Sequence, residues 1–471
     1  MASYPQFSVQ RGKPELVSPA EPTPYELKPL SDIDDQQALR FQVPLIFFYP
    51  HNPSIPGNRD PRLIIREALA KALVYYYPLA GRLREEGPNG KLTTECTGEG
   101  VLYIRADCDI KLEQFDGRFQ TPFLLDQLLF DVPDSSGILN CPILLIQVTR
   151  LLCGGFIFAV RLNHTMLDGH GLLQFLNAVA EIARGAKTPS IVPVWERDRL
   201  FKARDPPRVT YVHHEYKVQQ EDCLKKGNLD DDDDLSLDDV VEKSFYFGPS
   251  EISALRSHLP LHLKHSYSSF DVITACLWRC RTIALDPAPS NTTRLIFAIS
   301  ARGKPQCPLP VGYYGNTIAT PGVVTTAEKL CKNPLGYALE LIKKTKSSTV
   351  NNIGDYLQSV ADFMALNNRP PFPLSLTQTT YIVSDNSRLG WTEVDFGWGK
   401  PVYAGPADAT WVTYYSRSPR NKEGEVGIAA PIQLPKLRME RFVQEVRRMS
   451  TPTIPNSKFL SLLGLGRRLI K

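Results

Sequence analysis

A histidine and an aspartate four residues apart form the part of this chain best suited to chemistry. They stand in His164-Thr165-Met166-Leu167-Asp168, which is followed by Gly169. An imidazole can take a proton near neutral pH, and a nearby carboxylate can orient the ring or pair with a cation. The same pattern also fits a core histidine beside a solvated aspartate, so the motif needs support from the rest of the chain.

Two apolar runs place this motif at the end of a β-hairpin. Residues 141–148 and 156–162 are typical of buried strands, and the second run leads into the motif. Apolar residues at helical spacing then predict a helix over 172–185. Gly169-His170-Gly171 is predicted to be a flexible joint between strand and helix. His164 is therefore expected at the rim of a rigid hairpin.

A second motif, Asp395-Phe396-Gly397-Trp398-Gly399, lies in the last fifth of the chain. HxxxD followed by DFGWG resembles the BAHD acyltransferases, plant enzymes that move acyl groups from coenzyme A thioesters to alcohols or amines. Other segments stand in the order of that family, among them Tyr77 to Arg82, Cys276 to Arg281 and Tyr314-Gly315-Asn316. The resemblance covers nearly the whole chain, and it is strongest to the branch of benzyl alcohol O-benzoyltransferases and fruit-ester alcohol acyltransferases.

Length and patterning predict an α/β protein of two domains, because 471 residues exceed a comfortable single core. We place the domains at 1–205 and 245–471, with a crossover linker at 206–244. The linker holds the run Asp230–Asp234, whose charges repel one another and which lacks the interleaved spacing of a calcium loop. The resemblance implies that both domains are chloramphenicol-acetyltransferase-like, with an active-site channel between them.

The chemistry assigned to His164 is general base catalysis. The imidazole would take the proton of an acceptor hydroxyl as its oxygen attacks the thioester carbon. No convincing Ser or Cys nucleophile accompanies it, and the resemblance implies direct transfer in a ternary complex. Asp168 could polarise His164 as in a serine hydrolase. The resemblance instead implies a structural, orienting role, in which Asp168 pairs with Arg279.

The DFGWG loop is expected to shape the channel rather than to react. Asp395, Gly397 and Gly399 suit a tight, hydrogen-bonded turn and are taken as structural. Trp398 either packs within the loop or borders the acceptor pocket.

The phosphates of coenzyme A call for cations or free backbone amides. Arg302 and Lys304 match the basic segment of the family in place, although they could be ordinary solvated charges. Tyr267 and Ser268 match a stretch that borders the channel in relatives. A core tyrosine followed by a helix-capping serine is the alternative.

Bulk properties exclude several classes of function. Lys plus Arg number 54 against 50 for Asp plus Glu, which gives no basic surplus for nucleic acid. No apolar run is long enough to span a membrane. Nine scattered cysteines without a CxxC pair and an ending that is not Ser-Lys-Leu favour the cytosol. No metal site is expected, and histidines such as His213 are expected at the surface. The chain is expected to be a monomer.

Acyl-CoA is thus the expected co-substrate, with no bound cofactor and a small alcohol as acceptor. The branch favours benzoyl-CoA and benzyl alcohol, and aliphatic or tigloyl-CoA with aliphatic or alkaloid alcohols is the alternative. A condensation-domain-like enzyme and a non-catalytic acyl-CoA-binding homologue remain as other hypotheses. Gly169, His170 and the segment after Pro406 depart from the usual pattern of the branch, which leaves the choice of acyl group and acceptor open.

Overall fold

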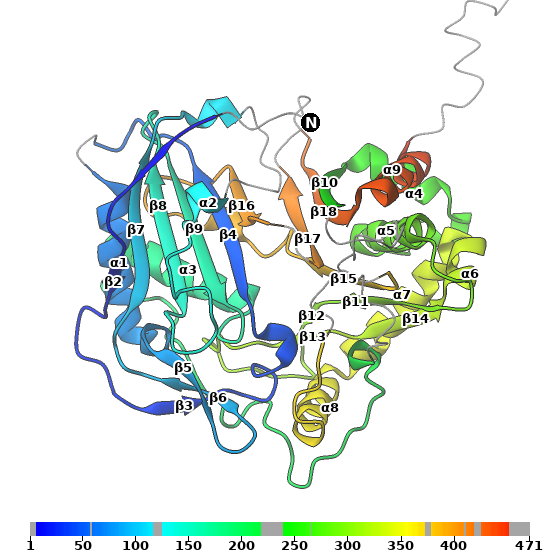
Figure 1. Ribbon diagram of the computed structural model, residues 1–471, viewed down its shortest axis with the longest axis horizontal. Coiled ribbons are helices and arrows are strands. Elements are labelled where there is room, and N and C mark those ends of the chain that lie inside the picture. The colour runs from blue at the N-terminus through cyan, green and yellow to red at the C-terminus, as the bar shows by residue number, and fades with distance from the viewer. Residues whose placement is uncertain are drawn as a thin grey trace, which may run out of the picture.

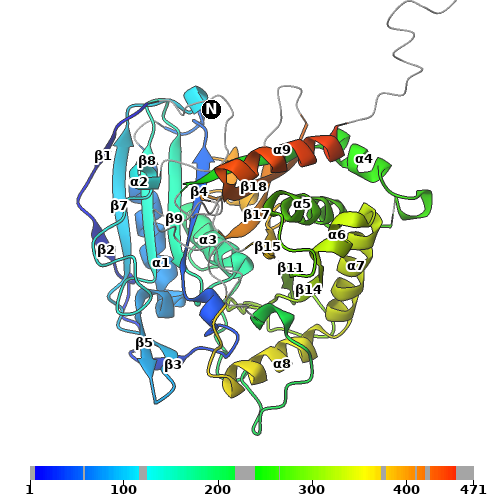
Figure 2. The same cartoon turned by 45° about the vertical axis from the view of Figure 1, so that its right-hand side comes forward.

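Two sheets, one in each half of the chain, organise the computed structural model (Figures 1 and 2). The structure describes residues 6–56, 59–115, 125–217, 239–264, 266–372, 378–408, 411–418 and 425–451. The run Asp230–Asp234 lies outside the described residues, and its role as a solvated linker stays a prediction.

The first sheet has the strand order β1-β7-β8-β9-β4-β16, with β2 also paired to β7. Its strands are β1 (Val9–Arg11), β2 (Glu15–Val17), β4 (Gln42–Tyr49), β7 (Val101–Cys108), β8 (Leu144–Arg150), β9 (Phe156–Asn163) and β16 (Tyr403–Pro406). The pair β7–β8 is parallel and the other pairs are antiparallel. The predicted hairpin is β8–β9.

Side chains cover both faces of this sheet, which explains why β8 and β9 are apolar at nearly every position. Helices α1 (Pro61–Tyr75) and α3 (Gly169–Ala183) pack against one face, and a second cluster around Phe48 and Phe115 covers the other. Asp60 caps α1 ahead of Pro61, a favoured pairing at a helix start. A small sheet lies beside this half and contains β3 (Leu27–Pro29), β5 (Arg82–Glu86) and β6 (Lys91–Glu95).

The second sheet has the order β10-β18-β17-β15-β11-β14. Its strands are β10 (Val240–Phe247), β11 (Thr292–Phe297), β14 (Gly322–Thr326), β15 (Thr380–Asp385), β17 (Val412–Ser418) and β18 (Gly427–Pro435). Its helices are α4 (Pro249–Ser257), α5 (Ser269–Leu285), α6 (Ala327–Lys332), α7 (Leu335–Asn351) and α9 (Lys436–Ser450). Below the second sheet in Figure 1, toward the first half, lies helix α8 (Ile353–Leu366). A short pair of strands lies there too and consists of β12 (Ile299–Ser300) and β13 (Ile318–Ala319).

One strand crosses between the halves. Its place in the fold differs from the domain division expected from the sequence, which puts residues 245–471 in the second domain. β16 lies late in the chain, yet it pairs with β4 of the first sheet, Tyr403 opposite Phe48. Phe396 and Trp398, just before β16, pack in the core of the first half. The sequence pattern predicts strands but not their partners, so this exchange could not be read from it.

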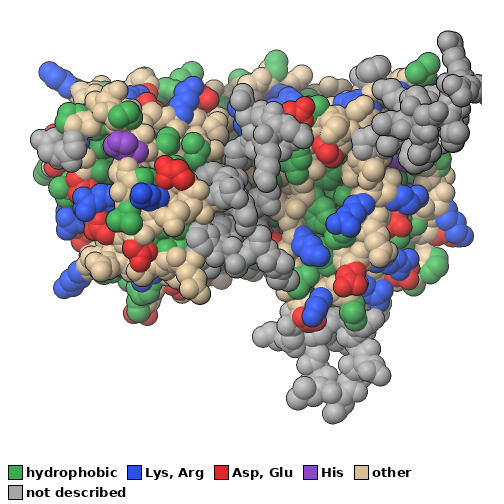
Figure 3. All heavy atoms as spheres, turned by 90° about the horizontal axis from the view of Figure 1, so that it is seen from above, with side chains coloured by type: hydrophobic (Ala, Val, Ile, Leu, Met, Phe, Trp, Pro, Cys, Tyr) green, Lys and Arg blue, Asp and Glu red, His purple; other side chains and the backbone are tan. Residues whose placement is uncertain are grey.

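The surface of the described residues carries both signs of charge. Figure 3 shows Lys and Arg interspersed with Asp and Glu over this face of both halves. In the described part of the chain, no helix has the length and apolar character needed to cross a membrane.

Candidate active site

His164 lies immediately after β9, at the rim of the hairpin, as the sequence pattern predicts. Its backbone N–H donates to the carbonyl of Phe41 at 3.0 Å, which ties it to the residue just before the adjacent strand β4. The side chain of Asn163 accepts from the backbone N–H of Thr165 at 3.2 Å and from its hydroxyl at 2.7 Å. The turn that carries the imidazole is therefore fixed on both sides.

The motif continues directly into α3, so the predicted flexible joint at 169–171 is wrong. Asp168 is the N-cap, and its Oδ1 accepts from the backbone N–H of Gly171 at 2.7 Å. A Cβ at Gly171 would lie 2.2 Å from the carbonyl oxygen of Tyr314. Gly171 thus allows α3 to approach the other half closely, and it provides no hinge.

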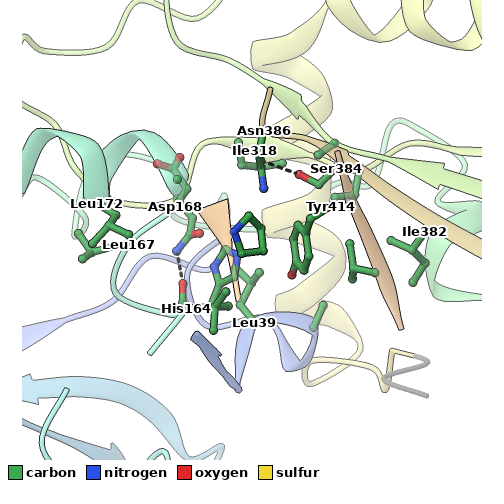
Figure 4. Close-up of a pocket in the computed structure, with 18 of the residues that line it drawn as sticks. Leu39, His164, Leu167, Asp168, Leu172, Ile318, Ile382, Ser384, Asn386 and Tyr414 are labelled. Carbon is green, nitrogen blue, oxygen red and sulfur yellow. Dashed lines mark hydrogen bonds between the residues drawn. The ribbon is translucent and has the colours of Figure 1, made fainter. Parts of the chain in front are cut away.

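A pocket of about 190 Å³ opens beside His164, and both halves of the chain line it. Figure 4 shows Leu167 and Leu172 on one side and Ile382, on β15, on the other. Most of the lining is apolar. The polar groups in it include Ser384, whose hydroxyl lies 3.3 Å from the side-chain oxygen of Asn386. This is the arrangement expected of a channel between two domains.

Burial lowers the pKa of His164 below the ordinary value of 6.5. A hydrogen bond to its own backbone, the charge of Asp168 and the side chain of Asn316 oppose this effect without overcoming it. The imidazole is therefore neutral and able to accept a proton at pH 7. Its Nδ1 is buried, which leaves Nε2 as the nitrogen that can face the pocket.

Asp168 pairs with Arg302, and the predicted pairing with Arg279 is wrong. An Arg302 nitrogen donates to both carboxylate oxygens of Asp168, at 3.2 and 3.3 Å. Thr317 donates to the same carboxylate through its backbone N–H and its hydroxyl, each at 3.1 Å. Arg279 instead donates to the carbonyl of Cys331 at 2.7 Å. The side chain of Asp168 points away from His164 (Figure 4), which supports a structural role over a triad-like one.

The contacts of Arg302 also bear on the expected phosphate site. The nitrogen that donates to Asp168, Nη2, also donates to the carbonyl of Gly315 at 2.7 Å, and Nη1 donates to that of Tyr313 at 2.5 Å, so both terminal nitrogens are already hydrogen-bonded within the protein. Lys304 is half-buried and does not line the pocket. Arg302 thus holds the two halves together, and the role of Lys304 toward coenzyme A stays a prediction.

Tyr267 and Ser268 adopt the second of the two expected roles. Tyr267 is buried in the core of the second half. Ser268 caps α5: its hydroxyl accepts from the backbone N–H of Asp271 at 3.2 Å and donates to the Asp271 carboxylate at 2.7 Å. Neither residue lines the pocket.

The DFGWG loop is a tight turn built around Asp395. One carboxylate oxygen accepts from the backbone N–H of Gly397 at 2.7 Å and of Gly399 at 2.8 Å. Both glycines have positive φ, at 102° and 92°, a region that strains other residues. These contacts support the structural role expected for all three residues.

Trp398 packs within the first half and does not line the pocket. Its ring makes an edge contact with Phe156, at 5.7 Å between centroids, and the guanidinium of Arg59 lies over it at 5.5 Å. Of the two expected roles, the geometry supports packing.

Sequence reasoning gave no role to three buried polar residues beneath the His164 turn: Asp34, Arg197 and Asn316. The side chains of Asp34 and Arg197 are fully buried and form an ion pair at 3.4 Å. Each of the three lies in a segment that resembles the family, and a polar residue in such a segment was the signal that could have pointed to it. His213 was also misplaced, because it is buried and contacts Glu215 and Ser359.

Two of the positions that depart from the branch, Gly169 and His170, line the pocket. A Cβ at Gly169 would lie 2.8 Å from a methyl carbon of Leu389, so the missing side chain is matched by a leucine that fills the space. His170 lines the pocket and also a second cavity of about 250 Å³ that contains Arg302. Pro406 lines the pocket as well, but Ala407 and Asp408, the described residues of the segment after it, do not. Gly169 and His170 are therefore placed to affect substrate choice, and an effect of the segment after Pro406 stays a prediction.

Comparisons with known proteins agree with this geometry. The model of a transferase family matches residues 7–449. The chain is 54% identical to benzyl alcohol O-benzoyltransferase of Nicotiana tabacum over 449 residues, covering 94% of each chain. It is 54% identical to alcohol acyl transferase 1 allele GSa of Malus domestica over 446 residues, again covering 94% of each.

Solved structures show the same fold. Vinorine synthase aligns with a TM-score of 0.69 at 22% identity, over 94% of this chain and 99% of that one. TRI101 of F. sporotrichioides, complexed with coenzyme A and T-2, aligns with a TM-score of 0.66 at 19% identity, over 90% and 99%. The predicted two-lobed α/β acyltransferase fold is thereby confirmed, and the chain belongs to the BAHD acyltransferase family.

Proposed function

We propose that this chain transfers the acyl group of an acyl-CoA to the hydroxyl of a small, mainly apolar alcohol, with benzoyl-CoA and benzyl alcohol as the leading pair. The observation that carries the proposal is a neutral, pocket-facing His164 in a mainly apolar pocket between the two halves. The names of the tobacco and apple relatives support the same reaction class.

The reaction follows from the position of the imidazole. Nε2 of His164 takes the hydroxyl proton of the alcohol as its oxygen forms a bond to the thioester carbon. The tetrahedral intermediate then breaks its C–S bond, and the coenzyme A thiolate leaves and accepts a proton. Acyl-CoA is a co-substrate in this scheme, and the protein contributes a base and a water-poor channel.

A substrate screen tests the proposal. Purified protein is incubated with benzoyl-CoA, acetyl-CoA and tigloyl-CoA, each against benzyl alcohol and a series of aliphatic alcohols. Ester is detected by mass spectrometry, and free thiol is measured in parallel. We expect ester from benzoyl-CoA and benzyl alcohol. Acyl-CoA binding without turnover would support a non-catalytic homologue, and transfer only from a carrier-bound thioester would support a condensation-domain-like enzyme.

The variant His164→Ala separates the base from the rest of the pocket. We expect its kcat to fall at least about 100-fold, because general base catalysis contributes about 10²–10⁴. Acyl-CoA binding by calorimetry should be retained. His262→Ala, at an exposed histidine of the short helix Leu261–Leu263, is the matched control and should behave as wild type. Near wild-type turnover of His164→Ala would contradict the base assignment.

We further propose that the enzyme acts as a monomer. Light scattering coupled to gel filtration at assay concentration tests it. A stable dimer would overturn this part of the proposal.

A further inference from the structure

Beneath the turn that carries His164 lies a buried polar network whose members come from three distant segments. Asp34 precedes the short helix Gln37–Leu39, Arg197 follows α3, and Asn316 precedes β13. All three are buried, and Asn316 lines the substrate pocket. Burying a charged pair is costly unless it is well hydrogen-bonded, so this network requires an explanation beyond stability.

Asn316 binds both the turn and Asp34. Its side-chain nitrogen donates to the carbonyl of His164 at 2.9 Å, to that of Thr165 at 3.3 Å and to Oδ1 of Asp34 at 2.9 Å. Its backbone N–H donates to the same Asp34 oxygen at 2.8 Å. Asp34 therefore fixes the amide, and the amide fixes the backbone of the catalytic turn.

Arg197 holds the next part of the same turn. It donates to the carbonyl of Thr165 at 3.3 Å and to that of Met166 at 2.5 Å, and its charge balances Asp34. Two side chains thus hold three successive carbonyls from His164 to Met166.

Two buried side-chain atoms beside this network have no hydrogen-bond partner among the described residues: Nδ1 of His164 and Oδ1 of Asn316. A buried N–H donor and a buried carbonyl oxygen each lose free energy when unpaired. The amide that carries Oδ1 is bonded through its nitrogen to the carbonyl of the same histidine at 2.9 Å, which places it beside the residue whose Nδ1 is unpaired. The backbone of His164, the charge of Asp168 and the side chain of Asn316 all raise the pKa of the ring, in that order of size.

We propose that Asn316 is a positioning residue for His164, in which Oδ1 of the amide accepts the Nδ1 proton and keeps Nε2 free to act as base. The inference rests on the proposed function. In serine hydrolases a carboxylate has this orienting task, and here the nearest motif carboxylate, Asp168, is paired with Arg302. A neutral amide can select the tautomer without adding a negative charge beside the ring.

The kinetic test compares Asn316→Ala with Asn163→Ala. Asn163 stabilises the same turn through Thr165, and its side-chain nitrogen donates to the carbonyl of Ile138 rather than to the imidazole, so Asn163→Ala reports on a loosened turn alone. For Asn316→Ala we expect kcat to fall about 10- to 100-fold with KM nearly unchanged. The acidic limb of its pH profile should move to lower pH, because a group that raises the pKa of His164 has been removed.

A spectroscopic test does not require turnover, so it separates this inference from the proposed function. In protein labelled with ¹⁵N-histidine, wild-type His164 should be neutral at pH 7 with its proton on Nδ1, assigned by comparison with His164→Ala. Asn316→Ala should lose this preference, and Asn163→Ala should keep it. The proposal would be overturned if Asn316→Ala and Asn163→Ala lost kcat equally and the acidic limb of the pH profile stayed in place. If Asn316→Ala does not fold, a wild-type His164 protonated on Nε2 would overturn it by itself.

Discussion

The two motif aspartates have the same side chain but are held in different ways. Asp168 is almost fully buried and receives donors from Arg302 and Thr317 of the second half as well as from its own helix. Asp395 is half-buried, and its carboxylate binds backbone N–H groups of its own loop. Asp168 therefore joins the halves around the site, whereas Asp395 shapes one turn. Removing the first should affect the whole fold, and removing the second should affect one loop.

The largest expected effect is that of Asp168→Asn. Asparagine is as good a helix cap as aspartate, but it leaves the cation of Arg302 poorly compensated. Removing one partner of a buried pair costs about 3–5 kcal/mol, and partial exposure of Arg302 places the expected loss at about 3 kcal/mol. Thermal unfolding measures it, with Asp355→Asn on the exposed face of α8 as control. An inactive but fully stable Asp168→Asn would revive a triad-like role.

The next prediction concerns which arginine pairs with Asp168. Arg302→Ala should be strongly destabilising, and the double variant with Asp168→Asn should show a coupling of about 1–3 kcal/mol. Arg279→Ala should show no coupling to Asp168, because it binds the carbonyl of Cys331. Unfolding of the single and double variants gives both coupling energies. Coupling to Arg279 of the same size would contradict the observed pairing.

A smaller effect is expected at Asp395. Asp395→Ala leaves the N–H groups of Gly397 and Gly399 without their acceptor, at a cost of about 1–2 kcal/mol. Asp395→Asn keeps an oxygen in place and should lose less. Turnover per folded molecule should change little in either variant. A loss of kcat at unchanged stability would assign Asp395 a role in the chemistry.

The smallest effect is a shift in pH dependence. The pKa of His164 lies below 6.5, so the acidic limb of kcat/KM should lie below that pH. His164 binds a proton more tightly in the unfolded chain than in the folded one. The contribution of this group to the free energy of unfolding is therefore present above pH 6.5 and is lost as the pH falls toward the folded pKa. The charge of Asp168 raises the pKa of His164, so Asp168→Asn should move the limb to lower pH by less than about one unit. Asp395→Asn should leave it in place.

Local pattern predicted much of the fold and the place of His164 at the end of a hairpin. The predicted hairpin is β8–β9, and the helix predicted over 172–185 is α3, which begins earlier, at Gly169. His164 was found because a histidine at a hairpin end is a local feature. Arg279 was assigned wrongly because the choice between two arginines depends on how the halves dock, and local pattern does not contain that information.

The sequence by itself determined many of the strands and helices and the residue types able to react, because these depend on periodicity and on neighbours in the chain. Only the tertiary structure decided the partners: Arg302 for Asp168, β4 for β16, and Asn316 with Asp34 beneath His164. The physical reason is that buried polar groups must be satisfied by whatever packing brings to them, and packing joins residues hundreds of positions apart.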